Sequence, residues 1–586
     1  MKRIGVFFCH CGLNIADTVD VERVAKEMRE YPDVVYVEDQ KYMCSDPGQN
    51  ALKGAIRDHL LDGVVIAACS PSMHETTFRN AVTSQGLNPY QCEIANIREH
   101  CSWVHREVRA EATAKAAEIT KTMVEKVRFN ESLELLSLPL VKRAMVVGAG
   151  IAGLQAALDI ADAGHPVILV EKEAGLGGHV AQLSGTYLNL EAASDALTEM
   201  IRRVEEHPLV QVLTRAQVQE ASGHVGSFTV RVNQEEDEAD GRSQDADSGR
   251  AGTQLRTFTF DVGAMILATG YELYPKEALG EYGGEHADVI DAVQFERLLA
   301  ANGPTGGQIR RPSDGMVPKE VVFVQCAGSR DPELHKPYCS KICCMYVAKQ
   351  AMMYKRQVPQ GQAYVFYIDI RSQGKGYEEF VQSAIDDYDV LYLRGKVSRI
   401  FEEDSKVMVW GVDTLSGAPV QVPADLVVLA TASVPSAEAK DLAQRLRVSL
   451  DEEGFFREAH PKLRPVETLT PGILLAGAGQ FPKDIPETIS HASGAAAKVL
   501  QLFSQHQIAQ EPTIACVDEE VCSGCGLCVS ACPYEAMSLH PRRSIAVVSP
   551  ALCRGCGACV AVCPSKACGV HNSDTAQLLA MVDALL

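Results

Sequence analysis

A cysteine motif that occurs twice near the end of this 586-residue chain restricts its fold more than any other feature. The motif is C-x2-C-x2-C-x3-C-P, first as CSGCGLCVSACP and then as CRGCGACVAVCP. This spacing predicts two [4Fe–4S] clusters, and the fourth cysteine of each run ligates the other cluster. A zinc site is a much weaker interpretation of two such repeats. One cluster is expected on Cys522, Cys525, Cys528 and Cys563, and the other on Cys553, Cys556, Cys559 and Cys532.

The twenty cysteines fall into three groups, at 9–101, 326–344 and 516–568. Cysteines that only pack a core would not leave such long gaps between groups. No export signal or apolar run of about 18 residues is visible, so we expect a cytoplasmic protein without a membrane span. In that compartment clustered cysteines favour metal or redox sites over disulfides. The net charge of −21 argues against nucleic acid as a partner.

The length suggests three or four domains, and the α/β pattern changes at identifiable points. An acidic, Gly- and Ser-rich stretch at 234–254 predicts a surface hairpin or disordered loop. The predicted parts are an N-terminal α/β iron–sulfur domain (1–130), a linker (131–142), a flavin domain (143–510), a ferredoxin domain (511–570) and a C-terminal helix (571–586).

The third domain opens on a dinucleotide fingerprint. Gly148, Gly150 and Gly153 form GxGxxG between a strand-like RAMVV and a helix-like IAGLQAALDIADAG, and Glu171 ends the next strand. The glycines let the backbone approach a pyrophosphate, and the acidic residue binds the adenosine ribose. We expect the nucleotide to be FAD, because three further segments resemble those of flavoproteins in the thioredoxin-reductase branch of the FAD/NAD(P) fold. The residues that carry this resemblance are Gly178, Ala268, Thr269, Gly270, Gly477, Ile485 and Pro486.

That branch normally has a second GxGxxG for NAD(P)H. Here the expected strand, KEVVFVQ, is followed by CAGSRD, and no other fingerprint is found in this half of the domain. The same region contains Cys326, Cys339, Cys343 and Cys344, which predict a third [4Fe–4S] cluster beside the flavin. A disulfide between adjacent cysteines would be strained, and the spacing does not fit a redox C-x-x-C pair. We expect Cys339 and Cys343 to share one face of a helix as i and i+4.

The first 100 residues alternate strand-like and helix-like runs, which predicts a small parallel sheet. Ligands collect at the edge where parallel strands end. Cys11, Cys44 and Cys69 follow such strands and are expected to hold a fourth cluster, with either Cys9 or Cys101 as the remaining ligand. Cys92, Cys516 and Cys568 are interpreted as core or surface thiols.

Taken together, these motifs resemble the A subunit of the heterodisulfide reductase family. The matching segments are GVFFCHCGLNI, CSDPGQ, AACSPSMHETTFR, GLNPYQCEIANIREHCSWVH, the FAD fingerprint, QCAGSRD…YCSKICCMYVAKQA, IDIRSQGKGYEEF and the ferredoxin repeat. Longer members carry an inserted ferredoxin module, which this chain lacks because the region from about 185 to 265 has no cysteine.

The resemblance implies an oxidoreductase subunit of an anaerobic complex that performs flavin-based electron bifurcation. The implied partners are B- and C-like redox subunits, a hydrogenase, formate dehydrogenase or NAD(P)H-oxidising subunit, and ferredoxin, in a complex that is commonly dimeric. Lys349 is a candidate to approach flavin N5 and stabilise a reduced, anionic flavin, and a solvated helix lysine is the alternative. Two rival functions are a stand-alone NAD(P)H-dependent flavin reductase and a non-bifurcating relay and assembly subunit.

Overall fold

The structure is a computed structural model that describes residues 2–235, 255–404 and 406–586. It contains two compact units, one formed by Met1–Leu138 with Ile508–Leu586 and the other by Pro139–Gln507. The first break lies within the predicted linker. The N-terminal and ferredoxin parts, which the sequence analysis treats as separate, belong to one unit. From residue 236 onward, the predicted acidic loop lies outside the described residues. No helix in the described ranges is long and apolar enough to cross a membrane.

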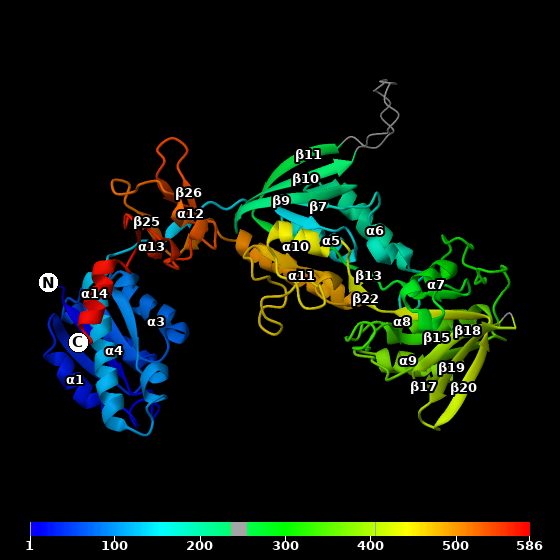
Figure 1. Ribbon diagram of the computed structural model, residues 1–586, viewed down its shortest axis with the longest axis horizontal. Coiled ribbons are helices and arrows are strands. Elements are labelled where there is room, and N and C mark those ends of the chain that lie inside the picture. Colours follow the sequence, from blue (N-terminus) through cyan, green and yellow to red (C-terminus); the bar gives the residue numbers. More distant parts are fainter. Residues whose placement is uncertain (1, 236–254, 405) are drawn as a thin grey trace. The chain divides into compact units, whose positions relative to one another are not determined.

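The N-terminal part of the first unit is a parallel sheet between two helical layers (Figure 1). The strand order is β2-β1-β3-β4, as expected for an α/β domain. Side chains of alternating strand positions pack against α1 and α4 on one face and against α2 and α3 on the other. The elements are β1 (Ile4–Cys9), α1 (Val21–Arg29), β2 (Val34–Gln40), α2 (Asp46–Asp58), β3 (Gly63–Ala68), α3 (Pro71–Thr83), β4 (Cys92–Asn96) and α4 (Arg109–Phe129).

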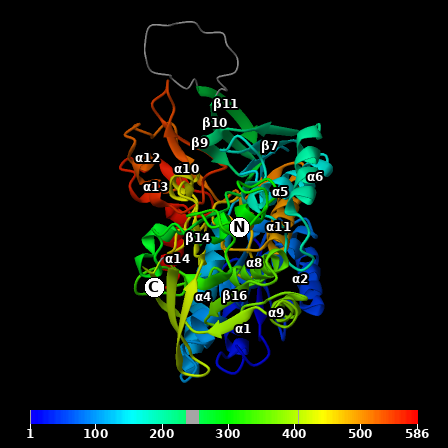
Figure 2. The ribbon, with the colours of Figure 1, turned by 90° about the vertical axis from the view of Figure 1, so that its right-hand side faces the viewer.

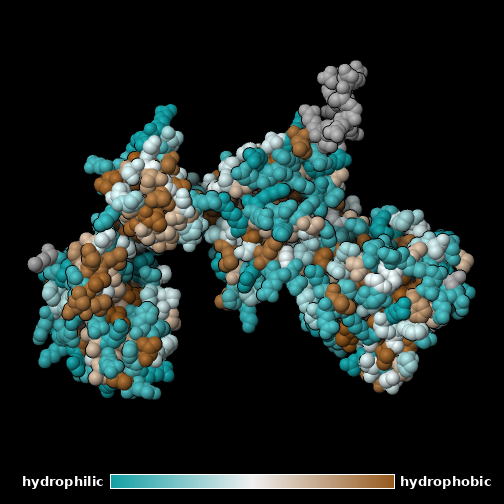
Figure 3. Space-filling model, viewed as in Figure 1, coloured by the Kyte–Doolittle hydropathy of each residue, from teal (hydrophilic) through white to brown (hydrophobic). Residues whose placement is uncertain are grey.

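The ferredoxin part of this unit consists of two short antiparallel sheets, β25-β28 and β26-β27, and two short helices. Its elements are β25 (Ala515–Val517), α12 (Leu527–Ala531), β26 (Met537–Leu539), β27 (Ala546–Val548), α13 (Ala558–Ala561) and β28 (Cys568–Val570). The last helix, α14 (Thr575–Asp583), lies along α4 in both views (Figure 1, Figure 2). The buried Gln577 side chain joins them by donating to Lys126 O (2.9 Å) and Asn130 Oδ1 (2.6 Å). The outer side of α14 exposes leucines, which form a brown patch in Figure 3.

The second unit contains the same arrangement twice, each time a five-stranded parallel sheet with helices on one face and a three-stranded antiparallel sheet on the other. The first sheet has the order β23-β12-β6-β7-β8. Its elements are β6 (Ala144–Val147), α5 (Ile151–Asp162), β7 (Val167–Val170), α6 (Ala193–Glu206), β8 (Val210–Leu213), β9 (Ala216–His224), β10 (Ser227–Glu235), β11 (Leu255–Val262), β12 (Ala264–Leu267), β23 (Ile473–Leu475) and α11 (Ile485–Phe503).

The second five-stranded sheet has the order β14-β21-β15-β16-β17. Its elements are β14 (Val289–Asp291), α7 (Ala292–Leu299), β15 (Glu320–Ala327), α8 (Cys343–Gln357), β16 (Gln362–Tyr367), α9 (Tyr377–Asp386), β17 (Leu391–Arg394), β18 (Val397–Glu403), β19 (Lys406–Asp413), β20 (Ala418–Ala424) and β21 (Leu426–Thr431). β15 holds the central position in this sheet, as β6 does in the first. The turns that follow these two strands are therefore structurally equivalent, and this equivalence positions the functional site.

The glycines of the fingerprint are fixed by steric limits. Gly148 has φ +102°, and a Cβ there would lie 2.4 Å from Ala268 O. A Cβ on Gly153 would lie 1.8 Å from Gly148 O, so α5 can approach the turn only with glycine at this position. Gly150 has no neighbour within 4.0 Å of such a Cβ except Gly178 Cα, which leaves its outer side open to a ligand.

We expect Gly153→Ala to lower the stability of the second unit, although alanine favours a helix. The added methyl must displace the turn, and overpacking of this kind costs about 1–3 kcal/mol. Gly494→Ala in α11 is the matched control, because its Cβ would meet Val466 Cγ1 at an ordinary 3.5 Å. Thermal unfolding of both variants checks the prediction, and an unchanged midpoint for Gly153→Ala would contradict it.

Candidate functional site

A cavity of about 700 Å³ lies at the carboxyl edge of the first five-stranded sheet. The fingerprint turn forms one wall through Gly148 and Gly150, and Glu171 lies at the end of β7. The Glu171 carboxylate accepts hydrogen bonds from Ala149 N (2.6 Å) and Glu173 N (2.9 Å), which fix its orientation. Other lining residues that the sequence predicts are Gly178, Ala268, Thr269 and Gly270.

The polar atoms of this cavity fit a dinucleotide such as FAD. Among the described residues, Thr269 Oγ1 and His179 Nδ1 are buried and have no hydrogen-bond partner, and both residues line the cavity. Buried polar groups without partners are rare, and such groups commonly contact a ligand. The His179 ring stacks on Tyr271 at 4.6 Å and its Nε2 lies 2.7 Å from Tyr271 O, so both rings are held in place.

Four predicted cofactor residues do not line the cavity itself. Gly153 packs α5 against the turn, and Gly477 donates its N–H to His491 Nδ1 (3.0 Å). Ile485 and Pro486 form the first turn of α11, whose N-cap is Asp484.

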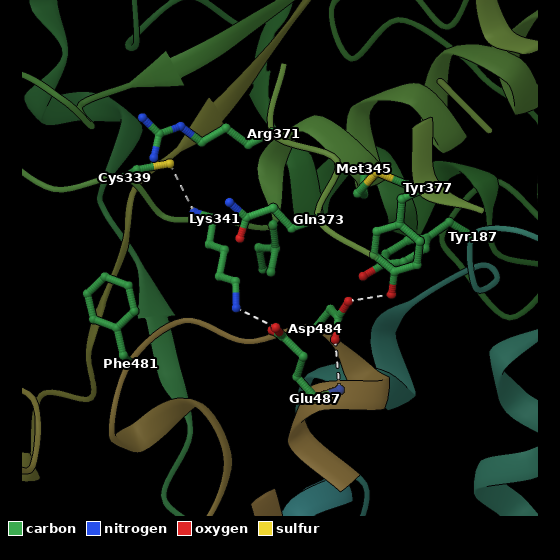
Figure 4. A pocket seen from close by; sticks show the side chains of 11 residues that line it. Tyr187, Cys339, Lys341, Met345, Arg371, Gln373, Tyr377, Phe481, Asp484 and Glu487 are labelled. Carbon is green, nitrogen blue, oxygen red and sulfur yellow. Dashed lines mark hydrogen bonds and ion pairs between the residues drawn. The ribbon is translucent and has the colours of Figure 1, made fainter. Parts of the chain in front are cut away.

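A second cavity, of about 300 Å³, lies beside the start of α11 (Figure 4). Asp484 accepts a hydrogen bond from Tyr377 Oη (2.6 Å), and Lys341 forms an ion pair with Glu487. Tyr187, Met345, Arg371 and Phe481 also line it. Cys339 lies on its wall, so this cavity adjoins the group of thiols described next.

The structure brings together four cysteines from the end of β15, the loop that follows it and the start of α8. A narrow cavity is lined by Cys326, Cys339, Cys343 and Cys344. Cys326 has φ +59° where the β15–β21 register shifts, and this left-handed conformation marks the end of regular strand pairing. The prediction that Cys339 shares a helical face with Cys343 is wrong, because α8 begins at Cys343 and Cys339 lies in the preceding loop. A loop of this length brings Cys339 to the same cavity without helical periodicity.

Positive side chains surround these thiols. Arg330, Lys341 and Arg371 line the same cavity, and Arg330 pairs with Asp369. Burial and the charges of Cys344 and Cys339 raise the pKa of Cys326 to about 12. Burial likewise raises the pKa values of Cys343 and Cys344. Four close thiols, three of them buried, with arginines beside them would bind iron tightly as thiolates and release their protons on binding.

The ferredoxin part contains two narrow cavities, and each is lined by cysteines of both repeats. The first is lined by Cys522, Cys525, Cys528 and Cys563, and the second by Cys532, Cys553, Cys556 and Cys559. These are the two sets that the spacing rule predicts. Backbone amides point at several of the sulfurs, as from Ala536 N to Cys532 Sγ (3.3 Å) and from Ala515 N to Cys553 Sγ (3.3 Å). Hydrogen bonds of this kind stabilise ligating thiolates.

At the carboxyl edge of the N-terminal sheet, Cys69 lies within electrostatic range of three other cysteines. Burial and the charges of Cys11, Cys9 and Cys44 raise its pKa to about 11, although Arg98 acts in the opposite direction. The Arg98 guanidinium donates to Cys11 Sγ (3.3 Å) and lies 4.9 Å from the Trp103 ring centroid.

Cys101 is placed elsewhere. It lies among the residues packed on the α1–α4 face of the sheet, and its thiol donates to Ala112 O (2.9 Å). Burial raises its pKa to about 11, and Lys115 and Glu118 supply the charges that influence it. Of the two alternatives that the sequence leaves open, the geometry favours Cys9, whose Sγ accepts from Cys11 N (3.3 Å) and Met43 N (3.4 Å).

In the described residues, no three His, Cys, Asp or Glu side chains converge on the position of a single metal ion. Thiols that hold a polynuclear cluster are spaced by the cluster, so their sulfurs stand further apart than the ligands of one ion. The cavities between the cysteines suit this wider spacing.

Lys349 is buried, at 2% exposure, so the interpretation as a solvated helix lysine is wrong. Its Nζ donates to Glu296 (2.8 Å) and to Gly185 O (2.8 Å). Burial acts to raise the pKa of Glu296, but Lys349 and hydrogen bonds from Ser184 and Gln350 outweigh it and hold that pKa below its ordinary value. Nothing in the sequence indicates this role for Glu296, because VQFERLL is an ordinary amphipathic helix pattern.

Comparisons with known proteins agree with this geometry. Residues 143–316 match the FAD binding domain family and residues 521–567 match the 4Fe-4S dicluster domain family. The chain is 41% identical to the second iron-sulfur A subunit of the CoB–CoM heterodisulfide reductase of Methanopyrus kandleri, over 92% of this chain and 91% of that protein. It is 38% identical to the A subunit of the H(2):CoB-CoM heterodisulfide,ferredoxin reductase of Methanothermobacter marburgensis, over 92% and 90%, respectively. The thioredoxin reductase of T. acidophilum is similar with 17% identity and a TM-score of 0.41, over 62% of this chain and all of that one.

The fold and the sites define a flavin and iron–sulfur oxidoreductase subunit, with an FAD-binding domain and a C-terminal 4Fe-4S dicluster domain. The chain belongs to the family of heterodisulfide reductase A subunits (HdrA).

We expect Lys349→Met to destabilise the second unit by about 3–5 kcal/mol, because it leaves Glu296 buried without a counter-charge. In the wild type, Glu296 contributes stability above pH 4.5, its ordinary pKa, and the contribution is lost as pH falls through the lower folded-state pKa. In the variant the pKa of Glu296 rises, so stability is lost at higher pH. Thermal unfolding from about pH 2 to about pH 8 measures both effects, because the wild-type loss falls below pH 4.5.

Adding Glu296→Gln to Lys349→Met removes the uncompensated charge and is expected to recover part of the lost stability. Lys375→Met, at an exposed position before α9, is the control and is expected to be neutral. Equal destabilisation by Lys349→Met and Lys375→Met would contradict the role of the buried pair.

Proposed function

We propose that this chain carries one FAD and four [4Fe–4S] clusters and transfers electrons in a bifurcating, heterodisulfide-reductase-like complex. The observation that carries the proposal is the position of the third thiol group. β6 and β15 are the central strands of equivalent sheets. The turn after β6 is a nucleotide fingerprint, whereas the end of β15 and the segment after it present four cysteines. A second nucleotide site has therefore given way to a site with the chemistry of an iron–sulfur cluster.

Each group of residues has a role in this proposal. The turn from Gly148 to Gly153 would bind the FAD pyrophosphate, and Glu171 the adenosine ribose. The start of α11, at Ile485 and Pro486 beyond Gly477, would face the flavin. The sixteen proposed cluster ligands are Cys9, Cys11, Cys44 and Cys69; Cys326, Cys339, Cys343 and Cys344; Cys522, Cys525, Cys528 and Cys563; and Cys532, Cys553, Cys556 and Cys559. A flavin can accept two electrons together and pass them on one at a time. It can therefore connect a two-electron donor to one-electron carriers.

Lys349 is proposed to act on the flavin electrostatically. Its Nζ contacts Gly185 O, three residues beyond Gln182 on the cavity wall. From there it would stabilise negative charge on a reduced flavin near N5, with Glu296 setting its position. A more negative flavin potential in Lys349→Met, at unchanged FAD content, is what this role requires.

The relatives' names supply part of the proposed partners, and the family resemblance supplies the rest. They name heterodisulfide reductases that act with hydrogen and ferredoxin, and for this chain we propose B- and C-like redox subunits, a hydrogenase, formate dehydrogenase or NAD(P)H-oxidising subunit, and ferredoxin. The assembly is proposed to be cytoplasmic and dimeric. Because the inserted ferredoxin module is missing, a low-potential electron would leave through the C-terminal ferredoxin part or a partner subunit.

Neither NADH nor NADPH is expected to bleach the flavin of the isolated chain, because the turn after β15 offers no second nucleotide fingerprint. The test is stopped-flow absorbance under anaerobic conditions, with dithionite as the positive control. Rapid bleaching would revive the rival function of a stand-alone reductase.

The complex recovered by anaerobic affinity capture is then assayed for coupled reduction of ferredoxin and a disulfide. Reduction of the disulfide alone would favour a non-bifurcating relay.

The anaerobically prepared chain is expected to contain about sixteen iron atoms, because four clusters of four irons use sixteen of its twenty cysteines. Cys44→Ala and Cys343→Ala should each lose the iron of one cluster. Cys101→Ala and Cys92→Ala are the matched controls, since both thiols are buried in the N-terminal domain and lie outside the proposed sets. Iron analysis with electron paramagnetic resonance (EPR) measures these changes. Loss of one cluster in Cys101→Ala and not in Cys9→Ala would overturn the assignment of Cys9.

A further inference from the structure

The two halves of the ferredoxin part differ at several positions, and two of the differences follow the fourth cysteine of each repeat and face the cysteine cavities. Aligning CPYEAMSL (532–539) with CPSKACGV (563–570) pairs Tyr534 with Ser565 and Met537 with Cys568. All four residues line a cavity, the first of each pair with the Cys532 set and the second with the Cys563 set. The repeat therefore provides an internal comparison of two otherwise similar sites.

The cavity of Cys522, Cys525, Cys528 and Cys563 has two additional side-chain donors. Cys568 is 6% exposed and lines this cavity together with Cys528 and Cys563, close enough for its thiol to act on the sulfurs of both. The Ser565 hydroxyl lies 3.7 Å from Cys563 Sγ. Cys568, which the sequence predicts to be a core or surface thiol, therefore lies beside a proposed cluster site.

At the two equivalent positions the other cavity has no buried side-chain donor, and the one cationic side chain that lines it, Arg554, is exposed. Met537 is buried and has no proton to donate, and Tyr534 is 45% exposed. A backbone donor is common to both halves, because Ala536 N donates to Cys532 Sγ (3.3 Å) and the equivalent Ala567 N donates to Cys563. The halves thus differ in their side-chain donors while sharing this backbone contact.

Hydrogen bonds to ligating sulfurs are one of the means by which a protein sets a cluster's potential. A donor stabilises negative charge on sulfur, and the reduced cluster carries one more negative charge than the oxidised cluster. Additional donors therefore favour reduction and make the potential more positive.

We propose that Cys568, with Ser565, makes the cluster on Cys522, Cys525, Cys528 and Cys563 the higher-potential member of the ferredoxin pair. This rests on the proposed function, since it assumes that both sets hold [4Fe–4S] clusters. Cys568 acts as a positioning residue through the sulfurs of Cys528 and Cys563 and is not itself a ligand. An electron shared between the two clusters would then reside on the cluster of the Cys563 set.

The test is an EPR-monitored redox titration of the full-length, anaerobically prepared chain. Cys568→Met copies the other half of the repeat, and Ser565→Ala removes the second donor. Both are expected to move only the more positive ferredoxin transition, toward negative potential, with iron content unchanged. The reciprocal Met537→Cys is expected to move the more negative transition toward positive potential. Cys516→Ala is the control, because Cys516 lies on the neighbouring strand β25 and lines neither cavity.

Unchanged midpoint potentials in Cys568→Met and Ser565→Ala would overturn the proposal. Loss of about four irons per chain in Cys568→Ala would also overturn it, since Cys568 would then be a ligand. If Cys568→Met does not fold, Ser565→Ala and Met537→Cys still decide the question. A wild-type chain without two ferredoxin-type EPR signals would refute the proposed function as well, whereas two wild-type signals with unmoved variants would refute only this inference.

Discussion

The chemistry of this chain depends on one geometric constraint, which is that parallel strands end at a common edge. In three parallel sheets that edge collects residues from separate segments: Cys11 and Cys69 in the N-terminal domain, Gly148 and Glu171 in the first half of the flavin domain, and Cys326 in the second. Because strand cores are buried on both faces, side-chain groups able to hold a cofactor are available mainly where the strands stop. The ferredoxin part has no such sheet, and a dense cysteine repeat takes its place.

Buried thiols beside one another make the fold depend on what they bind. Burial and mutual charge raise the pKa values of Cys69 and Cys326, so both would be protonated in a metal-free chain at neutral pH. Iron would displace those protons and join segments that are distant in sequence, which couples binding to folding. Arg98 and Arg330 lie close enough to stabilise the resulting negative charge. A buried Lys349–Glu296 pair serves a different purpose, since it ties α8 to α7 without a metal.

Features that depend on local sequence could be predicted, whereas features that depend on contacts between distant segments could not. The strands and helices of the first 100 residues, the fingerprint and the ferredoxin repeat are local patterns, and the structure places their elements where the patterns indicate. The prediction that Cys339 and Cys343 share one helical face is wrong, because helical spacing does not reveal where a helix begins. Cys9 and Cys101 could not be separated, since their difference lies in which face of the sheet each side chain occupies. The sequence does not indicate that Glu296 is buried and paired, because its partner Lys349 is brought close only by the tertiary fold.

The duplicated sheet explains how such a site can arise without a new fold. After β6, glycines let the backbone approach a phosphate, and Cβ atoms at Gly148 and Gly153 would collide with neighbouring backbone. After β15 the chain needs no close approach of this kind, because a thiolate reaches its metal through its side chain. The same strand end then accepts Cys326 at φ +59° and a long loop that returns with Cys339 before α8 begins. Under the proposed function, cysteines at the equivalent strand end would replace backbone recognition of a nucleotide with side-chain ligation of iron, while the sheets stay the same.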